Sequence, residues 1–175
     1  MRVLYDRDAD PNLIRAKRLA VIGYGAQGHA HALNLRDSGV DVVVALHQGS
    51  ASAAVASSAG FAVVSVSEAA RTRDVLVMCA PDEVLPGLYA NEIAPHLRAG
   101  QTLMFAHGFA VHYGFIQAPA GIDVVMVAPK GPGMALRSAF ERGGGFFHQR
   151  IHFAALTGML KPVLQRGTAE IQREP

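Results

Sequence analysis

The sequence predicts an α/β fold with a doubly wound parallel sheet. Short apolar runs rich in β-branched residues alternate with longer stretches of helical character. The runs are almost continuously apolar, as in strands that helices bury on both faces of a parallel sheet. Glycine-rich and polar clusters follow nearly every run, and in open parallel sheets ligands bind beyond the carboxyl ends of the strands. We therefore expect one shared site at that edge of the sheet.

Strands are expected where the apolar runs lie, at residues 19–22, 42–46, 62–66, 75–79, 102–106 and 124–128. Helices are expected between them, at residues 27–38, 52–58, 68–73, 83–89 and 92–97. Gly39, Gly60 and Gly100 follow three of these helices and are interpreted as helix stops, because glycine accepts the backbone conformation that ends a helix. The repeated strand–helix–strand order favours the doubly wound arrangement.

Past the three glycines at 143–145 the character of the sequence changes. Residues 142–169 contain no Asp or Glu. Residues 151–164 are a candidate helix, which Gly158 and Pro162 weaken. We therefore expect a single domain over residues 1–145 and a short tail over residues 146–175, for which no structure is predicted.

Composition and charge exclude several classes of protein. Sixteen Lys and Arg against 14 Asp and Glu give a net charge of +2 without a basic run, which argues against nucleic-acid binding. The apolar runs fall far short of the roughly 20 residues of a membrane span, and the N-terminus carries no apolar signal segment. The single cysteine, Cys79, excludes an internal disulfide and fits a small buried residue better than a nucleophile. A cytoplasmic domain without membrane contact is expected.

The segment GYGAQG at residues 23–28 follows the first predicted strand and opens a helix. Its spacing is G-x-G-x-x-G, the dinucleotide-binding pattern of Rossmann-type sheets. The first glycine permits a tight turn, the second lets the backbone approach a pyrophosphate, and the third lets helix and strand pack closely. The alternative is a glycine-rich turn without a ligand, but strand, loop and helix are all in place.

The stretch HQGSAS at residues 47–52 follows the next strand and decides between NAD and NADP. Folds that prefer NAD place an Asp or Glu about 20 residues after the glycines, where it binds the ribose 2′-hydroxyl. This stretch has no carboxylate, so its serine hydroxyls and His47 favour the 2′-phosphate of NADP. The alternative is an ordinary serine helix cap beside an exposed histidine.

Three further polar clusters lie at predicted strand ends. Pro81-Asp82-Glu83 places acids in a first helical turn, which helix electrostatics alone would also explain. His107, and Lys130 in the stretch PKGPG at 129–133, are suited to polarise a carbonyl or stabilise negative charge, although each taken alone also fits a surface residue. No histidine has partners at metal-ligand spacing, so no metal site is predicted.

These segments together resemble ketol-acid reductoisomerase. The resemblance covers about residues 1–145, and its most specific part is the segment GYGAQGHAHALNLRDSG at 23–39. The other matching segments are YD at 5–6, DAD at 8–10, GSAS at 49–52, PDE at 81–83, FAHG at 105–108, VAPKGPG at 127–133 and RGGG at 142–145.

The resemblance implies an activity and a set of site residues. The family reduces and isomerises 2-acetolactate and 2-aceto-2-hydroxybutyrate in valine and isoleucine synthesis, using NADPH and magnesium. It implies an active-site histidine at His107, and at Lys130 a residue that supports the substrate and the metal-bound waters. It also implies contacts to the dinucleotide, to its 2′-phosphate and to the rest of the cofactor from Tyr24, Gly25, Ala26 and Gln27, from His47, Ser50 and Ser52, and from Asp82, Glu83, Val84, Leu85 and Gly133.

Two positions depart from the family pattern. His47 stands where the family usually has arginine, and loss of one charge-assisted contact costs about 1.5–3 kcal/mol, or about tenfold to a hundredfold in NADPH affinity. Met134-Ala135 replaces the His-Thr that usually follows Gly-Pro-Gly.

The family continues into a helical domain that supplies the magnesium carboxylates and a substrate-binding serine, and nothing after Gly145 resembles it. The chain is therefore expected to be the NADP-binding domain alone, truncated and inactive unless a separate helical domain or another copy completes it. A surface meant for that partner domain is expected to lie bare. The alternatives are a free-standing NADP(H)-binding module without catalysis, and the remnant of a truncated gene with a non-native tail.

Overall fold

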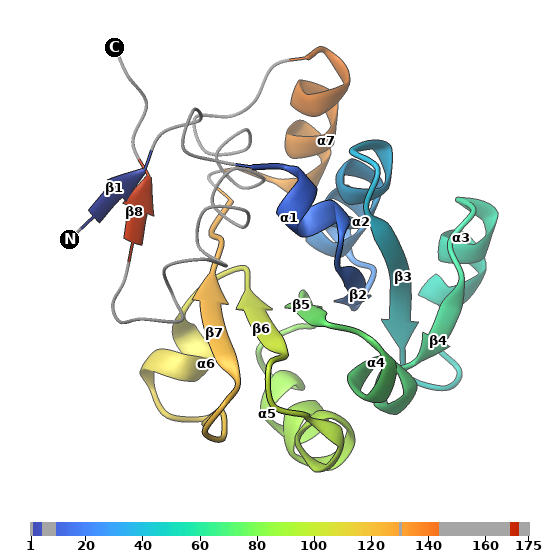
Figure 1. The fold of residues 1–175 in the computed structure, drawn as a ribbon. Coiled ribbons are helices and arrows are strands. Elements are labelled where there is room, and N and C mark those ends of the chain that lie inside the picture. The colour runs from blue at the N-terminus through green and yellow to red at the C-terminus, as the bar shows by residue number, and fades with distance from the viewer. Residues whose placement is uncertain (1, 5–9, 130, 144–168, 172–175) are drawn as a thin grey trace.

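A computed structural model describes residues 2–4, 10–129, 131–143 and 169–171 (Figure 1). Six parallel strands form one sheet in the order β4-β3-β2-β5-β6-β7. They are β2 (Arg18–Ile22), β3 (Asp41–Leu46), β4 (Val63–Ser65), β5 (Val75–Met78), β6 (Thr102–Phe105) and β7 (Asp123–Met126). The order reverses between β2 and β5, which is where such sheets bind ligands. The predicted fold class is confirmed.

Helices cover both faces of this sheet (Figure 1). Helices α1 (Asn12–Arg15), α2 (Ala26–Asp37) and α3 (Ser52–Ser58) contribute to the hydrophobic cluster on one face, and α7 (Gly133–Glu141) packs beside α2. On the other face lie α4 (Val66–Thr72), α5 (Leu85–Leu88), a π-helical turn η2 (Tyr89–Ile93), a 3-10 turn η3 (Ala94–His96) and α6 (Phe109–His112). A separate parallel pair joins β1 (Arg2–Leu4) to β8 (Ala169–Ile171).

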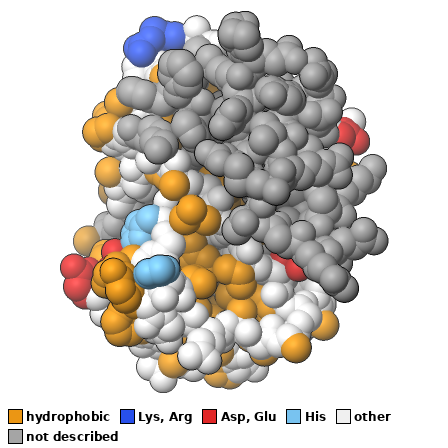
Figure 2. Space-filling view, turned by 90° about the vertical axis from the view of Figure 1, so that its left-hand side faces the viewer, with side chains coloured by type: hydrophobic (Ala, Val, Ile, Leu, Met, Phe, Trp, Pro, Cys, Tyr) orange, Lys and Arg blue, Asp and Glu red, His pale blue; other side chains and the backbone are white. Residues whose placement is uncertain are grey.

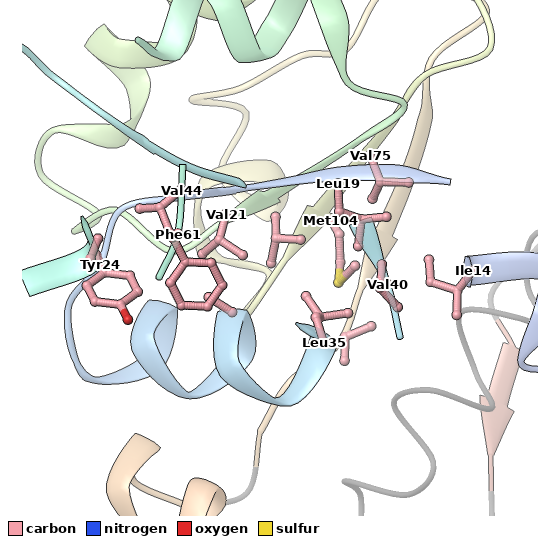
Figure 3. Close-up of a cluster of buried hydrophobic side chains, with 14 of the residues drawn as sticks. Ile14, Leu19, Val21, Tyr24, Leu35, Val40, Val44, Phe61, Val75 and Met104 are labelled. Atoms are coloured by element: carbon pink, nitrogen blue, oxygen red, sulfur yellow. The ribbon is translucent and has the colours of Figure 1, made fainter. Parts of the chain in front are cut away.

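Strand β2 shows why the apolar runs are continuous. Leu19 and Val21 belong to the cluster on the α2 face, which Figure 3 shows together with Leu35 and Val44. Ala20 and Ile22 belong to the cluster on the opposite face. Successive side chains of a strand point to opposite sides, and here both sides are buried.

The predicted strands agree with the structure to within about two residues, as do the helices at 27–38, 52–58 and 68–73. The helices expected at 83–89 and 92–97 differ, because α5 begins only at Leu85 and runs through η2 into η3 without a break. Helices α1, α6 and α7 were not predicted: α1 and α6 have four residues each, and α7 begins directly after a Pro-Gly loop. The candidate helix at 151–164 lies outside the described residues.

An apolar surface lies on the side of the molecule that carries α6 and the edge strand β7 (Figures 1 and 2). The rings of Phe109 and Phe115 stack at 5.7 Å, and Tyr113 lies 5.0 Å from Phe109. These rings and Met126 of β7 are each about half exposed or more. We call Phe109, Tyr113, Phe115 and Met126 the α6 surface.

None of the helices in the described ranges reaches the length and apolarity that crossing a bilayer requires.

Helix α2 holds a partly buried histidine, His31, whose charge state makes stability depend on pH. Burial lowers the pKa of His31 to about 4. The unfolded chain binds a proton at the ordinary value of about 6.5, so between these values the unfolded state binds more protons than the folded state. Stability is therefore expected to fall as the pH drops from about 6.5 to about 4, by up to about 3 kcal/mol. Urea unfolding of wild type and His31→Gln across this range measures it.

The difference in unfolding free energy between wild type and His31→Gln should shrink as the pH falls, since glutamine does not titrate. His112→Gln is the matched control, because it makes the same substitution at an exposed histidine on α6, outside α2. Parallel curves for wild type and His31→Gln would contradict the prediction.

Candidate dinucleotide-binding site

The turn between β2 and α2 depends on two glycines that have no room for a side chain. Gly23 has φ +95°, and a Cβ there would lie 3.0 Å from the carbonyl oxygen of Cys79. A Cβ on Gly28 would lie 2.2 Å from the carbonyl oxygen of Gly23. The chain therefore folds back on itself closely enough to bring the first turn of α2 against the end of β2, as the glycine spacing predicts.

Gly25 stands apart, because a Cβ added there would meet nothing within 4 Å. It is the N-cap of α2, and no side chain caps the helix. The first turn of α2 holds no acidic residue either. The main-chain amides and the positive end of a 12-residue helix thus face open space, an arrangement that binds phosphate groups.

A cavity of about 530 Å³ begins beside Gly23. This volume lies within the usual range of small-molecule sites, as does the mainly apolar wall with a few polar groups. Its lining comes from the carboxyl ends of β2 and β3, from the first residue of α4 and from the segment after β5, and comprises Ile22, Gly23, Ala45, Leu46, His47, Val66, Pro81, Val84, Gly87, Leu88, Asn91 and Glu92.

His47 lies at the end of β3 and is exposed. Its Nδ1 atom lies 2.9 Å from the carbonyl oxygen of Gln48, so in the neutral ring Nδ1 carries the proton and Nε2 is left as the acceptor. Ser50 follows in the loop and Ser52 is the first residue of α3, and the Ser52 amide donates to Ser50 Oγ at 3.4 Å. The structure thus brings the three residues predicted for the 2′-phosphate to one strand end.

For Tyr24 and Leu85, the predicted contacts with the cofactor can come only from main-chain atoms, because both side chains are buried. The Tyr24 side chain is 6% exposed and packs edge-on against the rings of His29 and Phe61 (Figure 3). Leu85 belongs to the hydrophobic cluster on the opposite face of the sheet, whereas Val84 lines the cavity and Glu83 is exposed. Burial also raises the pKa of Cys79 to about 12, which agrees with its interpretation as a small core residue.

Helix α7 is fastened to the start of α2. A Cβ on Gly133 would lie 1.9 Å from the Ala26 carbonyl oxygen, so the two helices touch through their main chains. Gln27 Nε2 donates to the Gly131 carbonyl oxygen at 3.1 Å. Further along, Arg137 donates to Asn34 and Asp37 at 2.9 and 2.7 Å. Gly133 therefore acts as a packing residue beside the site, and the role of Arg137 was missed because no local motif marks it.

Two predicted residues from different strand ends meet directly. His107 Nε2 lies 3.2 Å from Asp82 Oδ1, which joins the loops after the neighbouring strands β6 and β5. Both side chains remain partly exposed, so they are accessible to a ligand. Lys130, predicted for the same edge, lies outside the described residues. Within the described ranges no three His, Cys, Asp or Glu residues gather as metal ligands, so this part of the chain does not fit magnesium.

Comparison with known proteins decides the family. Residues 13–151 match the family described as "Acetohydroxy acid isomeroreductase, NADPH-binding domain". Over 143 residues the chain is 55% identical to the ketol-acid reductoisomerase (NADP(+)) of Clavibacter michiganensis subsp. michiganensis (strain NCPPB 382). The chain belongs to the ketol-acid reductoisomerase family. The alignment covers 82% of this chain and 42% of that relative, so it spans less than half of the curated protein.

Solved structures agree with this reductoisomerase assignment. A "NADH-preferring ketol-acid reductoisomerase from an uncultured archean" is 36% identical to this chain, and the two structures superpose with a TM-score of 0.82. The match covers 99% of this chain and 56% of the archaeal chain. The 3-hydroxyisobutyrate dehydrogenase of Mycobacterium tuberculosis has a TM-score of 0.60 at 17% identity, over 90% of this chain and 54% of its own, and shows the shared fold alone. The chain is thus the NADPH-binding domain of the reductoisomerase family.

Two alanine substitutions distinguish Gly28, which the turn needs in order to form, from Gly25, which leaves space for the cofactor. Gly25→Ala should leave the melting temperature within about 2 °C of wild type and lower NADPH affinity by about tenfold or more, because the new methyl group enters only the open space over the helix start. Gly28→Ala should lower both affinity and melting temperature, since its Cβ collides with Gly23. Calorimetric titration and thermal unfolding measure the two effects, and unchanged affinity in Gly25→Ala would contradict the prediction.

Proposed function

We propose that this chain supplies NADPH to a ketol-acid reductoisomerase reaction on 2-acetolactate and 2-aceto-2-hydroxybutyrate. The observation that supports this best is the uncapped start of α2 at Gly25, next to a cavity whose wall carries His47. The diphosphate of the cofactor lies over Gly25 and binds the main-chain amides of the first turn, from Ala26 and Gln27 onward. When bound, the nicotinamide supplies the hydride.

We assign the selection of NADPH over NADH to the residues that follow β3. Ser50 and Ser52 donate hydroxyl protons to the 2′-phosphate, and His47 contributes a further donor and a positive charge when protonated. The absence of Asp or Glu from residues 47–52 removes the usual acceptor for a ribose 2′-hydroxyl and spares the phosphate a repulsive charge.

His107 is the side chain we assign to the substrate end of the site. Its Nε2 lies 3.2 Å from Asp82 Oδ1, and we propose that Nε2 carries the proton of the neutral ring, which leaves Nδ1 able to accept a proton from a bound molecule. Asp82 and Glu83 border the cofactor at the same edge of the sheet. We place Lys130 beside the substrate as well. The described residues do not fit magnesium, and we derive no step through it.

A helical domain carried by a separate chain, or by a further copy, is the partner we propose. The α6 surface supports this, because its half-exposed aromatic rings directly follow the loop of His107 and offer an apolar area for a second domain to cover. A cytoplasmic location stays a prediction.

The serine pair at the end of β3 offers a direct test of cofactor choice. Replacing both Ser50 and Ser52 by alanine should weaken NADPH binding about tenfold to a hundredfold and change NADH binding less than threefold, since hydrogen bonds to a charged phosphate contribute about 1.5–3 kcal/mol each. Replacing Ser57 and Ser58, which are exposed on α3, is the matched control. Equal losses for NADPH and NADH would contradict the assignment of these hydroxyls to the 2′-phosphate.

Turnover separates the enzyme from a non-catalytic binding module. Mixed with a ketol-acid reductoisomerase helical domain, magnesium and 2-acetolactate, the chain should oxidise NADPH, and His107→Gln should lower the rate by about tenfold or more while leaving NADPH affinity unchanged. NADPH binding without turnover in this mixture would favour the free-standing module. Failure to bind either NADPH or NADH would overturn the proposed function.

A further inference from the structure

The outer edge of strand β7 takes no part in the proposed dinucleotide site. β7 is the last strand in the order of the sheet, and among the described strands it pairs only with β6. The amides of Asp123 and Val127 donate to carbonyl oxygens on the β6 side at 3.0 and 2.8 Å. The main-chain groups of successive strand residues point to opposite sides, so the N–H and C=O groups of Val124 and Met126 point away from β6.

The described residues give this edge none of the usual protection against pairing. Proteins commonly protect an edge strand with a lysine, a proline or a bulge. The outward residues Val124 and Met126 are instead uncharged, and they are 39% and 56% exposed. The opposite edge of the sheet differs, because β4 has only three residues and leads directly into α4. Of the two edges, β7 is therefore the one suited to pair with a further strand.

The surface beside this edge is apolar. A Cβ on Gly108 would lie 3.3 Å from Met126 Sδ, so the Met126 side chain reaches the start of α6. The stacked rings of Phe109 and Phe115 belong to the same α6 surface, and Figure 2 shows hydrophobic side chains gathered on this side of the molecule. A strand that pairs with β7 would therefore cover apolar side chains as well as main-chain groups.

The row of main-chain donors and acceptors on β7 is complementary to another strand rather than to a small ligand. A second copy of this chain supplies such a strand with its own β7. If the two strands run antiparallel about a two-fold axis at Val125, Val124 of each copy exchanges both main-chain hydrogen bonds with Met126 of the other. Asp123 then lies opposite Val127, so no like charges meet, and the net charge of +2 adds little repulsion between copies.

We propose that β7 pairs antiparallel with β7 of a second copy, which joins the two sheets into one across a two-fold axis at Val125. The inference goes beyond the proposed function, because the pairing requires neither cofactor nor substrate. A helical domain is the other candidate for this edge, and its binding there is one outcome of the test.

Sedimentation velocity of the full chain over a series of concentrations measures the pairing. Wild type should show a monomer–dimer equilibrium without larger species, since each copy has one such edge. Val124→Pro should weaken the dimer by about tenfold or more, because proline removes the outward N–H and leaves the hydrogen bonds to β6 intact. Val124→Thr is the matched control. It keeps that N–H and a β-branched side chain, so its dimer should stay within about threefold of wild type.

A charge at the same position provides a second variant that leaves the backbone unchanged. Val124→Lys places two like charges near the two-fold axis, so it should weaken the dimer, and high salt should restore part of the loss. Thermal unfolding shows that each variant is folded. Folded Val124→Pro and Val124→Lys variants that dimerise as well as wild type would overturn the pairing.

Cysteine cross-linking tests the register of the two strands. Directly opposed residues of a non-hydrogen-bonded pair have Cα atoms about 4.5 Å apart, within reach of a disulfide, whereas diagonal neighbours lie about 7–8 Å apart. Val125→Cys should therefore form a disulfide-linked dimer under mild oxidation, and Val124→Cys should form far less. Wild type, which has Cys79 alone, gives the background.

The remaining outcomes decide the occupant of the edge. A chain that is monomeric at every concentration would overturn the inference. So would a chain that forms a complex sensitive to Val124→Pro only with an added helical domain, or one that forms larger assemblies insensitive to Val124→Pro. Equal cross-linking of Val125→Cys and Val124→Cys would overturn the two-fold axis at Val125.

Discussion

The close contact between the end of β2 and the first turn of α2 is the constraint on which the site depends. Gly28 can lie against the Gly23 carbonyl only without a Cβ, and Gly23 itself passes close to the main chain at Cys79 and Ala80. These contacts aim the start of α2 at the carboxyl edge of the sheet. The cavity, the loop of His47 and the loops of Asp82 and His107 then surround that point, because their strands are neighbours in a parallel sheet.

Much of the fold could be predicted because its signals are local. A continuous apolar run marks a strand buried on both sides, as the two-sided burial of β2 shows, and glycine spacing marks the turn after it. The residues at the strand ends could be predicted as one site for the same reason. The topology of a parallel sheet gathers strand ends, so their proximity follows without knowledge of any single contact.

The remainder depends on contacts between distant parts of the chain. Nothing local in the sequence shows that Gly133 touches Ala26, that Arg137 reaches Asn34, or that His107 meets Asp82. The bounds of helix α5, which the prediction placed at 83–89, and the turn η2 that follows it were missed for a related reason. Their mixed sequence with Pro86 and Gly87 is a poor helix locally, and the burial of Tyr89 and Ile93 stabilises it only after folding.

The uncapped N-terminus of α2 has a consequence for the lifetime of the chain. Other proteins satisfy the free amides of a first turn with a serine or aspartate side chain, whereas here Gly25 leaves that task to the cofactor. A ligand that binds only the folded state adds about 2.7 kcal/mol of stability at a hundred times its dissociation constant. The abundance of this domain in a cell should therefore follow the supply of reduced nucleotide, because domains without bound cofactor unfold and are degraded more readily.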